Sequence, residues 1–170
     1  MEAIDQLLAA EGVRNCKATY WYAMDTKNYA LLETVFAADA IFDAREERDF
    51  ALGTKSGPLP PIEQSLRDGD MAIAKGPAAC ADMVRGSTEH WITVHHGAAP
   101  IITVTSADTA EAIWPLFDYI DDGKNALMAY GHYHEKYRRT DGQWQITFSR
   151  ITRLRGDGKH PWAAMVTQSV

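Results

Sequence analysis

The stretch from Ala126 to Arg155 reads ALMAYGHYHEKYRRTDGQWQITFSRITRLR, two long strand-like segments with Asp141 and Gly142 between them. An Asp-Gly pair flanked by such segments is typical of a tight hairpin turn. Shorter strand-like segments precede this stretch in WITVHH, PIITVTS and AEAIWPLFDYI. The second half of the chain therefore predicts four to six antiparallel strands that form one sheet.

The first half of the chain has the spacing of helices. Apolar residues recur at helical intervals from Ala3 to about Met24, where Gly12 is a candidate break, and again in NYALLETVFAADA, residues 28–40. The segment 75–83 begins with Lys-Gly-Pro and predicts a third, short helix. Helices that precede an antiparallel sheet predict an α+β fold in which the helices cover one face of a curved sheet.

The segment from Arg45 to Asp70 differs from its flanks because it is rich in proline, glycine and charged residues. Such a long stretch in a compact domain is usually a functional lid or a mobile insertion, so we predict a long loop insertion here. Its apolar residues need a place to pack. We expect them over the mouth of a pocket or on a neighbouring subunit: Phe50, Leu52, Leu59 and Ile62.

Composition narrows the functional class. The 170 residues, of which 46% are hydrophobic, are enough for a single domain over residues 1–170 with a sizeable core. A formal net charge of -6 disfavours a nucleic-acid-binding protein and favours small-molecule partners. No apolar stretch approaches the roughly 18 residues of a membrane-spanning helix, so we expect a soluble, cytoplasmic protein without a membrane partner.

Two adjacent histidines, His95 and His96, stand in the middle of a strand-like segment. Neighbouring side chains on a strand point to opposite faces, so only one of the two can enter a given pocket. His95 shares its face with Trp91 and Thr93, which is the mixed face expected of a pocket with a few polar groups. His96 lies with apolar neighbours, and an apolar face could equally line a pocket, so strand parity alone favours His95 only slightly.

Four segments in this order carry a family resemblance: YWYAMDTKNYALLETVFAADAIFD, KGPAACADM, TVHHG and YGHYHEKYRRTDGQWQI. Together they resemble the SnoaL-like family of the nuclear-transport-factor-two-like superfamily, from Ile4 to about Arg155. The resemblance implies a cone-shaped half barrel, that is, a curved antiparallel sheet with N-terminal helices that close an internal apolar pocket.

Within that family the chain resembles lindane dehydrochlorinase, scytalone dehydratase and bile-acid 7α-dehydratase through Asp25 in YAMDTKN and His95 in TVHHG. Those enzymes eliminate water or HCl from a ring without a metal or an organic cofactor, and the Asp/His pair supplies the base. The chemistry suits the residue types, because a carboxylate on one imidazole nitrogen fixes the tautomer and stabilises the imidazolium.

The resemblance therefore implies a cofactor-free lyase or isomerase that acts on a cyclic, largely apolar small molecule. The same fold also hosts binding modules and the noncatalytic β subunits of dioxygenases, so fold membership does not settle function. A non-catalytic small-molecule-binding module, or a structural protein like those subunits, is the alternative.

The resemblance to bile-acid 7α-dehydratase adds Tyr20 as a candidate that donates to a carbonyl or a departing hydroxyl. Helical geometry complicates this assignment, because five residues correspond to about 140° around the helix. Trp21 and Tyr22 lie closer to the face of Asp25 and are alternatives for the pocket wall. By the register of the family, Tyr133 lines the pocket. Helical geometry and strand alternation add the other substrate-binding residues that we expect: Trp21, Tyr22, Phe42, Trp114, Leu116 and Asp118.

Family members also place an arginine from the last strand over the pocket, and here Arg150 and Arg153 compete. Arg150 is in phase with Trp144, Ile146 and Phe148, so we assign Arg150 to the catalytic site. A β-bulge between these residues would instead turn Arg153 inward.

His132 and His134 form an H-x-H pattern that could bind a divalent metal, as in cupins. Cupins need further ligands from a neighbouring hairpin, and no second motif follows downstream. Cys16 and Cys80 are far apart and predict free thiols. We therefore expect no metal and no cofactor, and we place both histidines on the outer sheet face, where such folds often pack as a homodimer or homotrimer.

Overall fold

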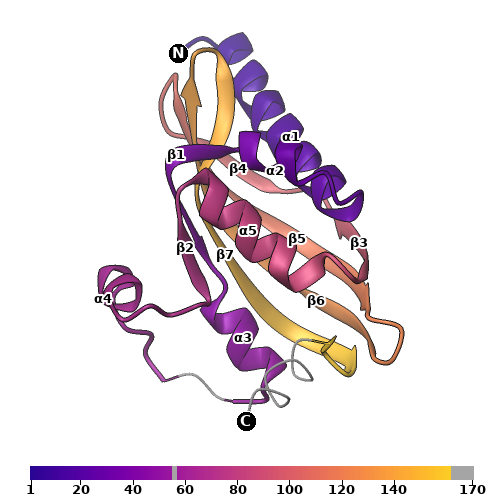
Figure 1. Ribbon diagram of the computed structural model, residues 1–170. Coiled ribbons are helices and arrows are strands. Elements are labelled where there is room, and N and C mark those ends of the chain that lie inside the picture. Colours follow the sequence, from indigo (N-terminus) through magenta and orange to yellow (C-terminus); the bar gives the residue numbers. More distant parts are fainter. Residues whose placement is uncertain (55–56, 162–170) are drawn as a thin grey trace.

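The computed structural model describes residues 1–54 and 57–161 (Figure 1). The described elements, in chain order, are α1 (Ala3–Asp25), α2 (Tyr29–Thr34), β1 (Phe36–Asp43), α3 (Arg45–Ala51), α4 (Ile62–Arg67), β2 (Ile73–Lys75), α5 (Pro77–Thr88), β3 (Ile92–Gly97), β4 (Ile101–Val104), β5 (Thr109–Asp121), β6 (Ala126–Thr140) and β7 (Gln143–Gly158). The α+β class predicted from the sequence is confirmed.

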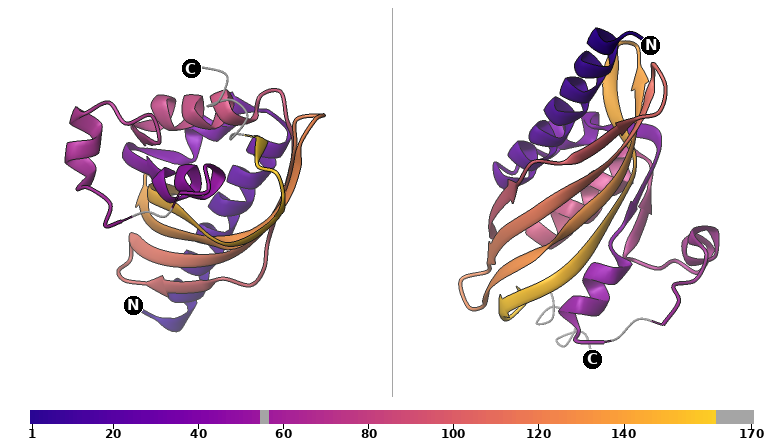
Figure 2. Two further views of the ribbon diagram at one scale, coloured as in Figure 1. Left: turned by 90° about the horizontal axis from the view of Figure 1, so that it is seen from below. Right: turned by 180° about the vertical axis from the view of Figure 1, so that it is seen from behind.

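In the described part of the chain, seven strands form one sheet in the order β2-β1-β7-β6-β5-β3, and β4 continues beside β3 along β5. All neighbouring strands are antiparallel except β1 and β7, which are parallel. The sheet is curved but not closed, and α5 lies over its concave face (Figure 2). Seen from behind, the long strands β5, β6 and β7 present an opposite face that none of the described helices covers. A site on the concave face is thus enclosed between sheet and helices.

The hairpin between β6 and β7 has the predicted turn. Asp141 and Gly142 both have positive φ values, 51° and 82°, as a type I′ turn requires. Gly12, by contrast, does not break the first helix, because α1 runs without interruption to Asp25. A Cβ on Gly12 would lie 2.3 Å from Cδ1 of Trp144, so this glycine allows β7 to approach the helix closely.

The helix expected over residues 28–40 ends at Thr34. Residues from Phe36 onward form β1, in which Ile41, Phe42 and Asp43 pair with β7 on one side and β2 on the other. Apolar residues in this segment satisfied a helical spacing, but the hydrogen bonds that two neighbouring strands offer override local propensity.

Residues 45–70 are not one long loop, since they contain α3 and α4. Arg45, which is buried, connects the two: its guanidinium pairs with Asp43 at 2.7 Å and donates to Ser65 Oγ at 2.9 Å. Phe50 packs beside Gly156 of β7. The segment therefore places α3 against the C-terminal part of β7.

The pairing of β6 with β7 shifts register twice, between Lys136 and Tyr137 and between Tyr130 and Gly131. At each shift β7 contains one extra residue, Thr147 and then Leu154, without a partner on β6. These β-bulges change which side chains point inward. Ile146 faces the core before the first bulge, whereas Ser149 and Ile151 do so after it.

None of the described helices combines the length and apolar character needed to cross a membrane.

Candidate active site

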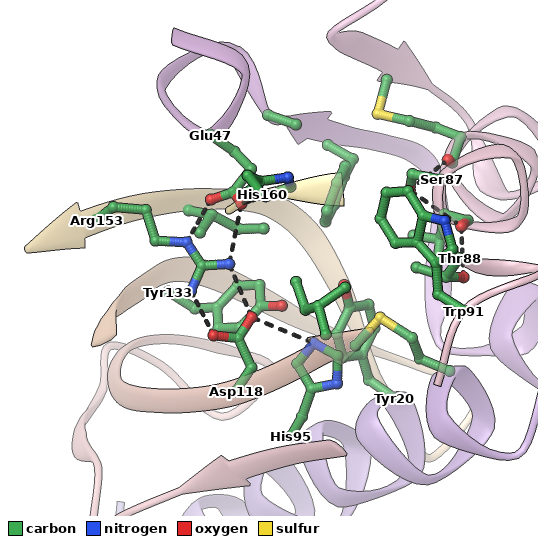
Figure 3. A pocket seen from close by; sticks show the side chains of 17 residues that line it. Tyr20, Glu47, Ser87, Thr88, Trp91, His95, Asp118, Tyr133, Arg153 and His160 are labelled. Atoms are coloured by element: carbon green, nitrogen blue, oxygen red, sulfur yellow. Dashed lines mark hydrogen bonds and ion pairs between the residues drawn. The ribbon is translucent and has the colours of Figure 1, made fainter. Parts of the chain in front are cut away.

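A cavity of about 80 Å³ lies between the concave face of the sheet and the helices α1, α3 and α5 (Figure 3). Met24, Phe42, Met83 and Trp91 contribute apolar walls. Polar side chains gather on the sheet side, where His95, Asp118 and Arg153 come from three different strands. The cavity thus combines an apolar interior with a few converging polar groups, as small-molecule sites do.

Asp25 and His95 are hydrogen-bonded to each other. Oδ1 of Asp25 lies 2.7 Å from Nδ1 of His95, and Oδ2 accepts the backbone N–H of His95 at 2.8 Å. Thr93 Oγ1 also donates to Oδ1, at 2.9 Å, and in turn accepts from Lys27 Nζ at 2.8 Å. A carboxylate at the end of a helix is unfavourably placed in the helix dipole, and these donors compensate for that position.

The electrostatics of this pair keep the carboxylate ionised. Burial alone would raise the pKa of Asp25, but the hydrogen bonds and charge of His95, together with Thr93, bring that pKa below its usual value. The ionised Asp25 accepts a hydrogen bond from Nδ1–H of His95, which leaves the lone pair of the neutral ring on Nε2. That nitrogen lies at the cavity, 3.7 Å from Oδ2 of Asp118.

The two adjacent histidines separate as strand parity predicted. His95 lines the cavity and shares the inward face of β3 with the buried Thr93. His96 points to the other face, where its ring packs edge-on against Phe117. Of the two, only His95 can reach a ligand in this cavity.

Arg153 lies inside the site, and this corrects the assignment of Arg150. The first bulge in β7 reverses the strand phase on which that assignment was based, so Arg150 points to the outer face and pairs there with Glu46 at 3.6 Å. Arg153 instead pairs with Asp118 at 2.7 Å and with Glu47 at 2.5 Å.

Glu47 and His160 join the site without having been recognised in the sequence. Glu47 comes from α3 and accepts from His160 Nε2 at 2.8 Å. Burial would raise the pKa of Glu47, but the charge of Arg153 and the hydrogen bonds from Arg153 and His160 lower it to about 2. Glu47 stood within a charged run, EERD, which resembles a solvated helix face, so no local signal separated it from its neighbours.

Tyr20 lines the cavity and is fully buried. Its Oη makes no hydrogen bond of ordinary geometry with the described residues, although the hydroxyl of Tyr133 lies near enough to act on its pKa. Burial raises the pKa of Tyr20 well above its usual value, so the phenol is neutral and can donate a hydrogen bond. The angular objection to Tyr20 does not apply, because Asp25 reaches the cavity only through His95 and need not share the face of Tyr20.

Some of the residues expected in the pocket wall lie at the cavity and others do not. Phe42, Asp118 and Tyr133 line the cavity. Four others do not: Trp21 packs edge-on against Trp114, Tyr22 is 62% exposed, Trp114 donates to Tyr137 Oη at 3.0 Å, and Leu116 is buried in the core. Helical geometry and strand alternation identify residues that share a face, but they do not determine which of them reach the cavity.

A further buried ion pair lies beside the rings of Tyr20 and Tyr133. Lys17 Nζ pairs with Glu135 at 2.7 Å and lies 3.3 Å from the ring centre of Tyr133 and 4.2 Å from that of Tyr20. Burial lowers the pKa of Lys17 to about 8, against the opposing effect of Glu135. The ammonium group of Lys17 thus makes cation–π contacts with Tyr20 and Tyr133, and these contacts help to fix the positions of both rings.

His132 and His134 lie on the outer face of β6, where Nε2 of His134 is 3.1 Å from Thr152 Oγ1. Within residues 1–54 and 57–161, no three His, Cys, Asp or Glu side chains are grouped so that they could hold a metal ion. Cys16 and Cys80 are both free and buried.

Comparison with protein families finds a match that covers most of the chain. The model of the SnoaL-like domain matches residues 5–150.

Solved structures with the same fold include enzymes and candidate enzymes of different activity. A candidate scytalone dehydratase from Novosphingobium aromaticivorans DSM 12444 is 16% identical, with a TM-score of 0.71 over 92% of this chain and 91% of that one. The hexachlorocyclohexane dehydrochlorinase LinA-type3 from Novosphingobium barchaimii LL02 is 16% identical, with a TM-score of 0.69 over 94% and 96%. A candidate aromatic ring hydroxylase from Novosphingobium aromaticivorans is 18% identical, with a TM-score of 0.70 over 94% and 96%. At these identities the likeness establishes the nuclear-transport-factor-two-like cone fold and leaves the activity to the site.

Proposed function

The chain belongs to the SnoaL-like domain family, and from that premise we propose that it is a cofactor-independent lyase or isomerase in which His95 is the general base. The substrate is a small, cyclic, largely apolar molecule. The observation that carries this proposal is the contact of 2.7 Å between Asp25 and His95, with Nε2 of His95 at the cavity.

The proposed reaction begins with proton removal from carbon. Neutral imidazole is a moderate base, so the C–H bond must be acidified, as it is next to a ring carbonyl. Nε2 of His95 takes this proton and leaves an enolate. The ionised Asp25 on Nδ1 stabilises the imidazolium, and the carboxylate of Asp118, 3.7 Å from Nε2, adds to that effect.

The same proton then completes the reaction. If the β carbon carries a hydroxyl, the imidazolium returns the proton to the departing oxygen, and the products are water and a conjugated ring ketone. If the ring instead holds a β,γ double bond, the proton returns to the γ carbon and the product is the conjugated isomer. Both outcomes leave His95 neutral again and require no external reactant.

Tyr20 supports this scheme as the donor to the substrate oxygen. A buried hydroxyl without a hydrogen bond costs about 1–3 kcal/mol, which a ligand oxygen would recover. A donor aimed at the position where negative charge develops lowers the barrier to enolate formation. The hydrogen bond from Tyr20 to the substrate oxygen is therefore strongest in the transition state.

The size of the cavity bears on how the substrate binds. About 80 Å³ is well below the roughly 300–1,000 Å³ of most ligand pockets. Met24 and Met83 line the cavity, and their unbranched side chains can move at low cost. We expect a single ring to bind after these side chains shift.

The outer sheet face supports a homo-oligomeric assembly as part of this proposal. Exposed apolar side chains follow this face from strand to strand: Ile92, Val94, Ile101, Ile113, Met128 and Tyr130. Exposed apolar side chains concentrated on one face are typical of a protein–protein interface. A dimer or trimer would leave the cavity, on the concave face, free for substrate.

Proton exchange tests the base directly. Simple cyclic ketones without a leaving group are incubated in D₂O with the protein, and NMR follows loss of the α-proton signal. Wild type should accelerate the exchange in the presence of EDTA, and His95→Ala should not. Cyclic β-hydroxy ketones then report elimination through the absorbance of the conjugated product. A protein that binds these ketones but exchanges no proton would be a binding module.

A further inference from the structure

The guanidinium of Arg153 binds two carboxylates, those of Glu47 and Asp118. Nε and Nη2 donate to the two oxygens of Glu47 at 2.5 and 3.0 Å, and Nη1 and Nη2 donate to the two oxygens of Asp118 at 2.7 and 2.8 Å (Figure 3). A guanidinium offers two edges with parallel N–H bonds, and each binds one carboxylate in bidentate fashion. Both edges are therefore filled by the protein itself.

These three side chains are buried but belong to different parts of the fold. The exposed fractions of the side chains are 3% for Arg153, 8% for Glu47 and 1% for Asp118. Arg153 and Asp118 come from β7 and β5, the two strands that flank β6 in the sheet, whereas Glu47 comes from the helix α3. All three line the cavity, so a space left by the Glu47 carboxylate would be continuous with the space for the ligand.

We propose that Glu47 sets the charge selectivity of the cavity: by closing the edge of Arg153 that Asp118 leaves open, it makes the cavity accept uncharged ring ligands and reject ligands that carry a carboxylate. This rests on the proposed function only in that the same cavity holds the substrate. It narrows the substrate class from cyclic, largely apolar molecules in general to those that carry no carboxylate.

The reason is a competition for one donor edge. A buried arginine with a free edge is a strong site for a carboxylate or phosphate. Here a ligand carboxylate would have to displace Glu47, which His160 also holds, or remain unpaired beside Glu47 and Asp118. An unpaired buried charge next to like charges is strongly disfavoured. A hydroxyl or carbonyl escapes this penalty because it brings no charge.

Two probes that share a ring test the selectivity without any turnover. Isothermal titration calorimetry compares benzyl alcohol with benzoate on the full-length protein. Wild type should bind benzoate at least about tenfold more weakly than benzyl alcohol. Glu47→Ala should gain at least about tenfold in benzoate affinity and change little toward benzyl alcohol. Equal affinity of wild type for both probes, or an unchanged ratio in Glu47→Ala, overturns the proposal.

Glu46→Ala is the matched control. Glu46 is the preceding residue of α3 but pairs with Arg150 on the outer face, so its loss removes one charge from the same helix without touching Arg153. Its preference between the two probes should equal that of wild type. A shift as large as that of Glu47→Ala would mean that net charge, and not the edge of Arg153, decides.

Acetate provides a second measurement that needs no ring ligand. Acetate can fill the space of the missing carboxylate, so it should raise the melting temperature of Glu47→Ala in proportion to its concentration and leave wild type unchanged, with chloride at equal ionic strength as reference. No stabilisation by acetate would overturn the proposal even if neither ring probe binds. Neither experiment measures catalysis, so the two proposals are tested independently. The proposed selectivity can be wrong while His95 is the base, and His95 can fail as the base while the selectivity is correct.

Discussion

Nδ1 of His95 lies 2.7 Å from Oδ1 of Asp25, although the two residues are 70 positions apart and belong to β3 and α1. The end of α1 is held against β3 by three hydrogen bonds to one carboxylate, two from His95 and one from Thr93. This contact links the helix that closes the cone to the strand that carries the proposed base.

Replacing His95 by Ala should abolish turnover of a cyclic β-hydroxy ketone and leave ligand affinity nearly unchanged. Loss of a general base costs about 10²- to 10⁴-fold in rate, whereas the ring makes only part of the cavity wall. Steady-state kinetics and calorimetry of the same variant separate the two effects. His96→Ala is the control and should remain active, since His96 faces the other side of the sheet. Loss of activity in His96→Ala alone would contradict the assignment.

Asp25→Asn should reduce the rate by about 10²-fold or more, because the amide can no longer neutralise the imidazolium. Thr93→Val is a graded comparison, since it removes one donor to Asp25 but keeps the charge, and it should cost less. Rates of both variants are measured with the same ketone. If Asp25→Asn is as active as wild type, then the contact with His95 is structural.

Tyr20→Phe should lower activity and not lower stability. The substitution removes a buried hydroxyl that makes no hydrogen bond of ordinary geometry with the described residues, so the free energy of unfolding should stay constant or rise by about 1 kcal/mol. The rate should fall by about tenfold or more, because the enolate loses its donor. Urea denaturation and kinetics measure the two quantities. A marked loss of stability with unchanged rate would show that Oη serves the core.

Acid should destabilise the protein through Glu47. Its pKa is lowered from 4.5 to about 2 in the folded state, so the unfolded chain takes up a proton in this range while the folded chain does not. The stabilisation is present above pH 4.5 and is lost as the pH falls toward 2, by about 3 kcal/mol. Denaturation at several pH values should show this loss reduced by a similar amount in Glu47→Gln. Other carboxylates titrate in both proteins, so the comparison is between the two curves of unfolding free energy against pH. If wild type and Glu47→Gln lose the same free energy between pH 4.5 and pH 2, Glu47 is not paired in the folded state.

The proposed assembly through the outer sheet face should weaken when charge is placed on it. Ile101→Lys and Ile113→Lys introduce a cation among the exposed apolar side chains of β4 and β5. Light scattering should show a dimer or trimer for wild type at micromolar concentration and a smaller species for the variants. Met71→Lys is the control, because Met71 is exposed outside the sheet. A monomeric wild type would rule out the assembly.

Some of this protein could be predicted from the sequence alone because local physics decides it. Alternation along the strands identified the long strands and placed His95 and His96 on opposite faces. The Asp-Gly pair specified its turn, since few other residues tolerate two positive φ values in succession. The partnership of Asp25 with His95 came from the family resemblance, and no spacing rule could have supplied it.

Only the tertiary structure decided the rest of the site. The first bulge in β7, at Thr147, arises where β6 and β7 fail to pair residue for residue, and it turns Arg153 into the cavity and Arg150 out of it. Glu47 and His160 meet although they are 113 positions apart, and both belonged to segments without a regular pattern. Local sequence specifies that side chains alternate along a strand. The position of a bulge, which interrupts this alternation, depends on the pairing with a neighbouring strand. The inward side chains near a bulge, and the charges that meet across the cavity, are therefore properties of the assembled fold.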